Sequence, residues 1–138
     1  MTQQLLPLVV VVVLIAAASL WYRRADGAVR RIDATFGPDE LRALGLPRRR
    51  PALLLFTAPG CPPCISARRV LDEVGPRHDV DVVVALVTDH PAIASAQHVY
   101  RAPTVFLVDE RGHAISRMSG VPRVADLEQA LALVAVAA

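Results

Sequence analysis

The sequence predicts an α/β fold in which helices flank a central mixed sheet, preceded by one N-terminal transmembrane helix. Three observations support this prediction. Residues 1–22 carry no charged side chain, apolar runs alternate with helical patterns from residue 51 onward, and the only two cysteines lie three residues apart between a strand pattern and a helix pattern. We expect a membrane anchor at 1–22, an Arg-rich juxtamembrane linker with a short helix at 23–50, and one globular domain at 51–138.

The N-terminal segment is apolar over residues 5–20, apart from Pro7 and Ser19. As a helix it extends roughly 24–27 Å, close to the hydrocarbon thickness of a bilayer, and Trp21 and Tyr22 follow at a position suited to the interface. A cleavable signal peptide is the alternative, because alanines 16–18 resemble a cleavage site. The charge order favours an uncleaved anchor, since no Arg or Lys precedes the apolar run and two Arg follow it.

Basic charge is concentrated beside this segment. All 15 basic residues are Arg; residues 23–50 hold eight of them against four acids, whereas residues 51–138 hold seven against nine acids. The excess is local and lacks interleaved aromatics, so we expect anionic lipid head groups as its neighbours and no nucleic-acid partner. Because positive flanks stay inside, we expect an outward N-terminus and a cytoplasmic C-terminal domain, with the extracytoplasmic side as the alternative.

Residues 23–31 are polar, and we expect a mobile linker there. Pro38, Asp39 and Glu40 open a short helix that ends at Gly45, because acids favour a helix start and glycine its end. The remaining patterns predict an order of β-α-β-α-β-β-α. These elements are a strand at 52–56, a helix at 64–74, a strand at 80–87, a helix at 90–99, strands at 104–108 and 114–118 joined by a turn at 110–113, and a closing helix from 124. The buried side of the helix at 64–74 is expected to contain Ile65, Val70, Leu71 and Val74.

Cys61 and Cys64 are held at the turn from the first of these strands into the helix that follows. A thiolate at a helix N-terminus is favoured by backbone N–H groups and the helix dipole, so the pair can exchange two electrons, with Cys61 attacking and Cys64 resolving. A structural disulfide is an alternative, although so small a loop removes little unfolded-state entropy. A zinc site is another, but the chain has no second C-x-x-C and its four His are scattered, so we expect no metal.

The order of elements, the Cys-Pro-Pro-Cys turn at 61–64 and the Ala-Pro-Thr tripeptide at 102–104 resemble the thioredoxin family over about residues 36–138. The resemblance implies a thioredoxin-like fold, an exposed nucleophile in Cys61, a less accessible Cys64 and no cofactor. It also implies a cis Ala102–Pro103 bond beside the disulfide, where a trans proline opening a strand is the alternative. The backbone at this bond then pairs with an extended substrate segment. The implied substrate contacts are Gly60, Pro62, Ala102 and Pro103.

Two positions depart from the family pattern. Thioredoxins usually have a tryptophan before the first cysteine and a buried aspartate in the preceding strand, where this chain has Gly60 and Leu55. Without the aspartate the resolving thiol lacks its usual proton acceptor, which predicts slower turnover or a narrower range of substrates. Gly60 leaves the surface beside Cys61 open to a bulkier partner.

Pro62 and Pro63 have no N–H, so they stabilise a Cys61 thiolate less than other residues do. A less stabilised reduced form holds its electrons less firmly, which favours a role as a reductase. The sequence therefore predicts a membrane-anchored thiol-disulfide oxidoreductase that reduces protein disulfides. Its expected partners are disulfide-bearing protein substrates, an electron-donor thiol system and the lipid bilayer. Two alternatives stay open: a dedicated redox maturation factor for a membrane or secreted protein, and a redox-inert binding module of thioredoxin fold.

Overall fold

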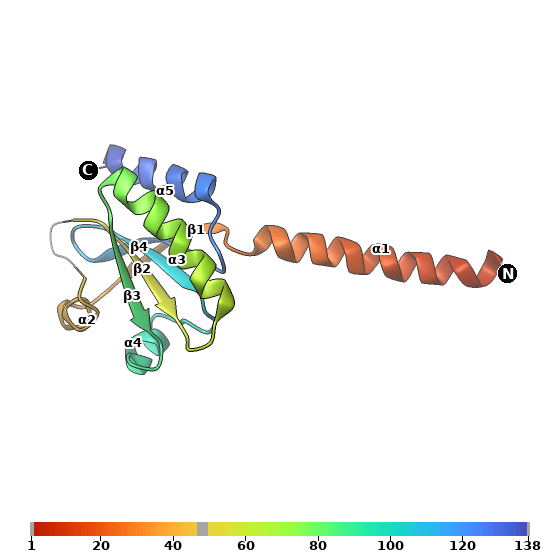
Figure 1. The fold of residues 1–138 in the computed structure, drawn as a ribbon, viewed down its shortest axis with the longest axis horizontal. Helices are drawn as coiled ribbons and strands as arrows, with labels where there is room; N and C mark the ends of the chain where they lie inside the picture. The colour runs from red at the N-terminus through yellow and green to blue at the C-terminus, as the bar shows by residue number, and fades with distance from the viewer. Residues whose placement is uncertain (1, 47–49, 138) are drawn as a thin grey trace.

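The computed structural model describes residues 2–46 and 50–137. A long helix leads into a layered domain of five strands and further helices (Figure 1). The helices are α1 (Thr2–Ala25), α2 (Pro38–Ala43), α3 (Pro62–Val74), α4 (Pro91–Ala96) and α5 (Val124–Ala137), with a 3-10 turn η1 (Gly75–His78) after α3. The strands are β1 (Val29–Thr35), β2 (Ala52–Thr57), β3 (Asp81–Leu86), β4 (Thr104–Val108) and β5 (His113–Ser119).

The five strands form one sheet in the order β1-β5-β4-β2-β3. β2 and β3 are parallel, whereas the other three neighbouring pairs are antiparallel, so the predicted mixed sheet is confirmed. The parallel pair follows from the α3 crossover between β2 and β3, and the antiparallel β4 and β5 are joined by a tight turn, as parallel and antiparallel connections require.

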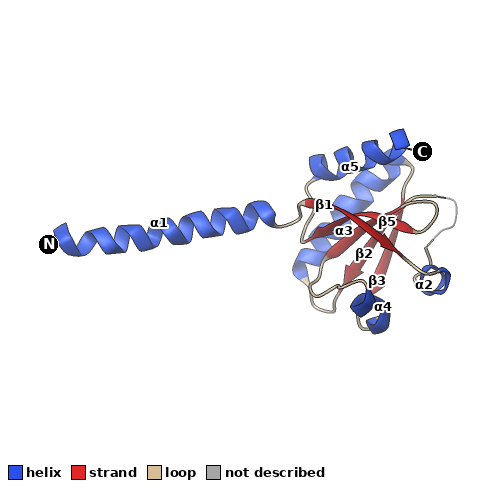
Figure 2. Ribbon diagram, turned by 180° about the vertical axis from the view of Figure 1, so that it is seen from behind, coloured by secondary structure: helices blue, strands red, loops and turns tan. Residues whose placement is uncertain are grey.

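The sheet is covered on both faces, α3 and α5 lying over one and α2 and α4 over the other (Figure 2). Side chains alternate along β2. Leu53 and Leu55 point into the core between the sheet and α3 and α5, which we call the first core. Leu54 and Phe56 point into the core on the opposite face, under α2 and α4, which we call the second core. In the second core, the Phe106 ring meets the rings of Phe36 and Phe56 edge to face. Burial on both faces explains why β2 reads as a continuous apolar run.

The segment between the long helix and β2 differs from the prediction. We expected a mobile linker over residues 23–31, but α1 continues to Ala25 and Val29–Thr35 forms β1, which pairs with β5. The register shifts between Arg31 and Ala34. Val29 packs on the first core and Ala34, an odd number of residues further along the strand, packs on the second. As an edge strand with polar outward residues, β1 lacks the apolar run that identifies a central strand.

One side chain of α3 is also placed differently from the prediction. Val70 packs against the first core and Leu71 and Val74 are buried in it, as expected, but Ile65 is 59% exposed. The face of α3 that meets the sheet runs through Cys64 and Ala67 instead. This arrangement turns the second cysteine inward and leaves an apolar side chain on the surface beside it.

Candidate active site

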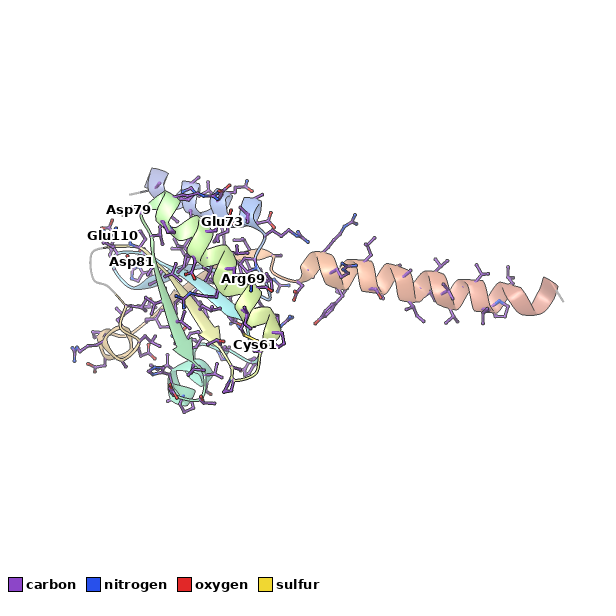
Figure 3. All side chains as sticks on the ribbon, in the orientation of Figure 1. Cys61, Arg69, Glu73, Asp79, Asp81 and Glu110 are labelled. Carbon is purple, nitrogen blue, oxygen red and sulfur yellow. A yellow bond between two sulfur atoms is a disulfide. The ribbon has the colours of Figure 1, made fainter. Side chains whose placement is uncertain are left out.

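Cys61 and Cys64 form a disulfide at the N-terminus of α3, with their Cα atoms 5.3 Å apart. Cys61 is the N-cap residue, in extended conformation, and the helix begins at Pro62, where a fixed φ and a missing N–H are both tolerated. The Cys64 N–H donates to the Cys61 carbonyl oxygen at 3.1 Å. The strand-to-helix turn thus brings the two sulfurs together at the end of the domain marked by Cys61 in Figure 3.

The two cysteines are unequally exposed. Cys64 is only 5% exposed because it lies on the face of α3 that packs against the sheet. Cys61 is partly exposed, and Pro62 and Pro63 on the first turn are exposed. Of the two cysteines, Cys61 is therefore the one more accessible to a molecule approaching from solvent.

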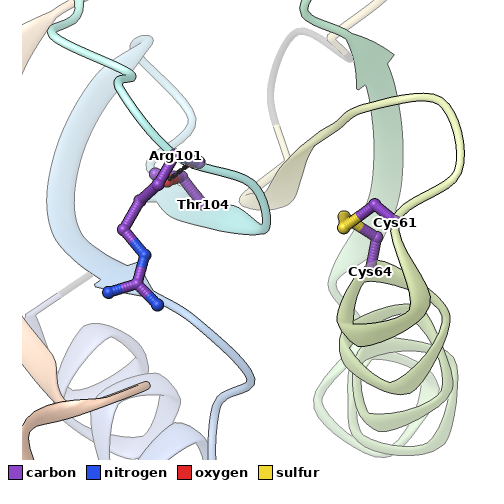
Figure 4. Close-up of a disulfide and its surroundings, with 4 residues drawn as sticks. All are labelled: Cys61, Cys64, Arg101 and Thr104. Carbon is purple, nitrogen blue, oxygen red and sulfur yellow. Dashed lines mark hydrogen bonds between the residues drawn. A yellow bond between two sulfur atoms is a disulfide. The ribbon is translucent and has the colours of Figure 1, made fainter. Parts of the chain in front are cut away.

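The Ala102–Pro103 peptide bond is cis, as the resemblance implied, and it immediately precedes β4. The loop is fixed at two points: Thr104 Oγ1 donates to the Arg101 carbonyl oxygen at 2.7 Å, and the Gly120 N–H donates to the Pro103 carbonyl oxygen at 2.8 Å. Figure 4 shows the disulfide directed toward the loop that runs from Arg101 to Thr104. The candidate site thus combines the start of α3 with the loop that leads into β4.

Ala102 has a backbone suited to pairing with another chain. It is partly exposed, and among the described residues neither its N–H nor its carbonyl oxygen has a hydrogen-bond partner. Pro103 beside it is buried, and its carbonyl oxygen is already bonded to Gly120. One donor and one acceptor therefore remain available in the loop toward which the disulfide is directed.

Gly60 has a backbone reason for being glycine. Its φ is +65°, in the left-handed region where residues with a Cβ are strained, and a Cβ there would meet nothing within 4 Å. The backbone conformation, rather than crowding, restricts this position. The surface beside Cys61 is consequently open where the thioredoxin pattern has a tryptophan.

Leu55 fills the first core from the middle of β2. It is 1% exposed, pairs with Val84 of β3 and Val105 of β4, and lies in the same cluster as Leu71 of α3. Its apolar neighbours offer no partner for a charge. The part of the chain that the structure describes also contains no group of three His, Cys, Asp or Glu side chains that could hold a metal ion.

Sequence reasoning missed residues that position the cis loop. The Arg117 guanidinium donates to the carbonyl oxygens of Gln97 at 3.1 Å and His98 at 2.7 Å, and it lies 5.3 Å from the centroid of the Phe106 ring. Burial lowers the pKa of Arg117 from its ordinary value. His98 has φ +52°, so these bonds hold a strained turn just before the loop. A lone arginine on a strand carries no sequence signal for this role.

Comparison with known proteins gives matches of structure only, since no family model and no curated protein matches the sequence. An uncharacterized thioredoxin-like protein from Clostridium perfringens superposes with a TM-score of 0.58 at 18% identity, over 64% of this chain and 73% of its own. Chloroplastic thioredoxin z gives 0.58 at 20% identity, over 78% and 98%. A mutant thioredoxin from Halobacterium salinarum NRC-1 gives 0.58 at 24% identity, over 70% and 84%. This chain therefore has a thioredoxin-like fold that carries a close cysteine pair able to serve a redox role.

Proposed function

We propose that this protein is a membrane-anchored thiol-disulfide oxidoreductase that reduces protein disulfides. The observation that carries the proposal is the unequal exposure of two joined cysteines, Cys61 partly exposed and Cys64 buried. A sulfur of another protein can reach Cys61, whereas Cys64 is placed to attack the neighbouring Cys61 sulfur. This makes Cys61 the nucleophile and Cys64 the resolving thiol.

The reaction consists of two exchanges. In the reduced protein the Cys61 thiolate attacks one sulfur of a substrate disulfide, forming a mixed disulfide and releasing the other substrate sulfur as a thiolate that takes a proton from water. Cys64 then loses its proton to water and attacks the Cys61 sulfur. This releases the second substrate sulfur as a thiolate, which takes a proton from water, and leaves the Cys61–Cys64 disulfide. Two electrons pass to the substrate, and an electron-donor thiol system restores the dithiol.

The residues around the pair support the binding of an extended substrate segment. The unpaired donor and acceptor of Ala102 allow one strand-like pairing, which holds the substrate beside the sulfurs, and buried Pro103 fixes the bend that presents them. Gly60 and Pro62, which flank Cys61 in the sequence, are exposed. We assign all four as substrate contacts.

The first turn of α3 supports the reducing direction. A side chain at an N-cap accepts hydrogen bonds from the N–H groups of the second and third helical residues. Here the second is Pro63, which has no N–H, and the N–H of Cys64 is already donated to the Cys61 carbonyl oxygen. A Cys61 thiolate is thus little stabilised, so the dithiol gives up its electrons readily.

α1 supports membrane anchoring. Its stretch Leu6–Ala25 is long and apolar enough to cross a membrane, and none of it is buried against the domain. The whole helix of 24 residues extends about 36 Å, against about 30 Å of hydrocarbon. Arg23 and Arg24 lie in the last turn of the helix, so we propose that the redox domain lies on the cytoplasmic side; the extracytoplasmic side is the alternative.

A dedicated maturation factor is the second candidate. The buried position where thioredoxins usually have an aspartate holds Leu55, which has no carboxylate, and such a protein can depend on one particular partner to complete the exchange. It would deliver electrons to one membrane or secreted protein rather than to many.

Trapping tests the proposal. With Cys64→Ser, the attack on the mixed disulfide cannot occur, so Cys61 should remain linked to its substrates; Cys61→Ser, the matched control, should trap none. Both are read on non-reducing gels of membranes from cells producing the full chain. Equal trapping by the two variants would refute the assignment of roles. A wild-type pair that never exchanges with a dithiol in a thiol titration would instead select a redox-inert binding module.

A further inference from the structure

We infer that the redox pair acts on disulfides held close to the membrane surface, in juxtamembrane segments of integral membrane proteins in the same bilayer; this inference rests on the proposed function. It comes from the way α1 is joined to the domain. Asp26, the first residue after α1, accepts a hydrogen bond from the Arg101 guanidinium at 2.5 Å. Arg101 directly precedes the cis Ala102–Pro103 bond, so one ion pair separates the end of the anchor from the substrate-binding edge.

Further contacts fix this junction. Gly27 donates its N–H to the Ser119 carbonyl oxygen at 2.8 Å, and a Cβ on Gly27 would lie 1.9 Å from the Val121 oxygen, so the chain packs here without room for any side chain. Arg123 donates to the carbonyl oxygens of Arg23 and Arg24 at 3.3 and 3.4 Å, which are among the last carbonyls of α1 and lack partners within the helix.

Gly120 connects the junction to the site itself. Its N–H bonds the Pro103 carbonyl oxygen, and a Cβ on it would lie within 2.6 Å of three carboxylate atoms of Asp26. Asp26, Gly120 and Pro103 therefore form a continuous contact from the anchor to the cis loop. Movement of the anchor relative to the redox site requires these contacts to break.

The direction of α1 sets where the site faces. In Figure 3, Cys61 lies at the end of the domain from which α1 departs, and α1 extends away from that end. When α1 crosses a bilayer, the disulfide faces the head groups, as do Arg23 and Arg24 at the end of the helix. A bulky soluble protein must then enter between the domain and the membrane, whereas a juxtamembrane loop is already there. Ile65, which follows Cys64 in the sequence, is exposed and adds an apolar side chain to the surface at this end of the domain.

The test uses the pre-reduced full chain in liposomes with three substrates that carry the same disulfide loop. In one the loop directly flanks a single membrane span; in the second a flexible spacer of about 20 residues, reaching about 25 Å, separates loop and span; the third is the soluble loop. Loop and redox domain are placed on the same side. We expect single-turnover reduction, measured by thiol labelling, to be about tenfold faster for the flanking loop than for the spaced one, since the local concentration at the site is higher.

A flexible Gly-Ser insertion between Ala25 and Asp26 should bring the two membrane-bound rates within about twofold, because it frees the domain to turn, while leaving the soluble loop's rate unchanged. Asp72→Asn, which breaks the exposed Arg68–Asp72 pair elsewhere on α3, should keep the preference. Equal rates for flanking and spaced loops in the wild type, or a preference that survives the insertion, would overturn the inference. If none of the three loops is reduced, the proposed function itself is refuted instead.

Discussion

At the scale of single residues, Leu55 and Gly60 show how this chain modifies a thioredoxin-like site. Leu55 is buried in an apolar cluster that also contains Leu71 of α3, so this position contributes packing but no proton acceptor. Gly60, the residue before the N-cap, has a φ of +65°, which lies in the left-handed region that favours glycine. Neither change disturbs the disulfide, and both alter what surrounds it.

Leu55→Asp tests whether the missing carboxyl limits resolution. An aspartate here should accept the Cys64 proton and speed decay of the mixed disulfide, followed by stopped-flow after mixing with a substrate disulfide. Because the position is 1% exposed, the variant should also lose about 3–5 kcal/mol of unfolding free energy. Leu53→Asp is the matched control, as it lies on the same face of β2 about 7 Å further from the site. Unchanged resolution in folded Leu55→Asp, or an equal gain in the control, would contradict this role.

At the scale of elements, β1 brings residues before position 51 into the sheet. It pairs with β5 from Val29 to Thr35, and Phe36 behind it is 2% exposed against Phe106. β5 in turn carries Gly120 at its end, whose N–H fixes the Pro103 carbonyl. The strand that sequence patterns missed therefore supports the element that holds the loop with the cis Ala102–Pro103 bond.

Truncation measures this contribution. A chain lacking residues 1–25 should unfold cooperatively in urea, followed by circular dichroism, whereas a chain lacking residues 1–37 loses β1 and Phe36 and should unfold at a clearly lower urea concentration. In the shorter deletion, Phe36→Ala should cost about 3–5 kcal/mol because it empties a buried aromatic site. Equal midpoints for the two deletions would show that β1 contributes little.

At the scale of the whole molecule, the anchor and the redox site are parts of one arrangement. α1 supplies a membrane-crossing length, and the contacts of Asp26, Gly27 and Arg123 replace a flexible linker with a fixed junction. If α1 spans a membrane as proposed, the arginines in its last turn decide which compartment the redox pair meets. That compartment determines whether the pair is kept reduced.

Orientation is checked with alkaline phosphatase fused to the C-terminus, which is active only when exported. We expect an inactive fusion, because Arg23 and Arg24 follow the span and favour the cytoplasmic side, and we expect activity when both are moved to follow Met1. Replacing Arg68 and Arg69 by Gln removes the same charge far from the span and should change nothing. An active fusion of the unaltered chain would place the redox domain outside.

The sequence by itself determined the features that depend on local pattern: the apolar helix, the strands β2, β3 and β4, and a cysteine pair at a helix start. A strand buried on both faces appears in the sequence as a continuous apolar run, and an amphipathic helix appears as apolar residues at helical spacing. The cis bond at Pro103 was expected only through the resemblance, since most X-Pro bonds are trans.

Only the tertiary structure decided the features that depend on residues far apart in the chain. β1 is a strand because it pairs with the edge of β5, and its exposed polar residues leave no apolar pattern in the sequence that would predict it. Ile65 points outward because the buried side of α3 is occupied by Cys64 and Ala67. The pairing of Asp26 with Arg101 joins residues 75 positions apart, and a charge pair at that separation leaves no periodic signal in a sequence. It forms because the folded sheet brings the end of the anchor to the loop before β4.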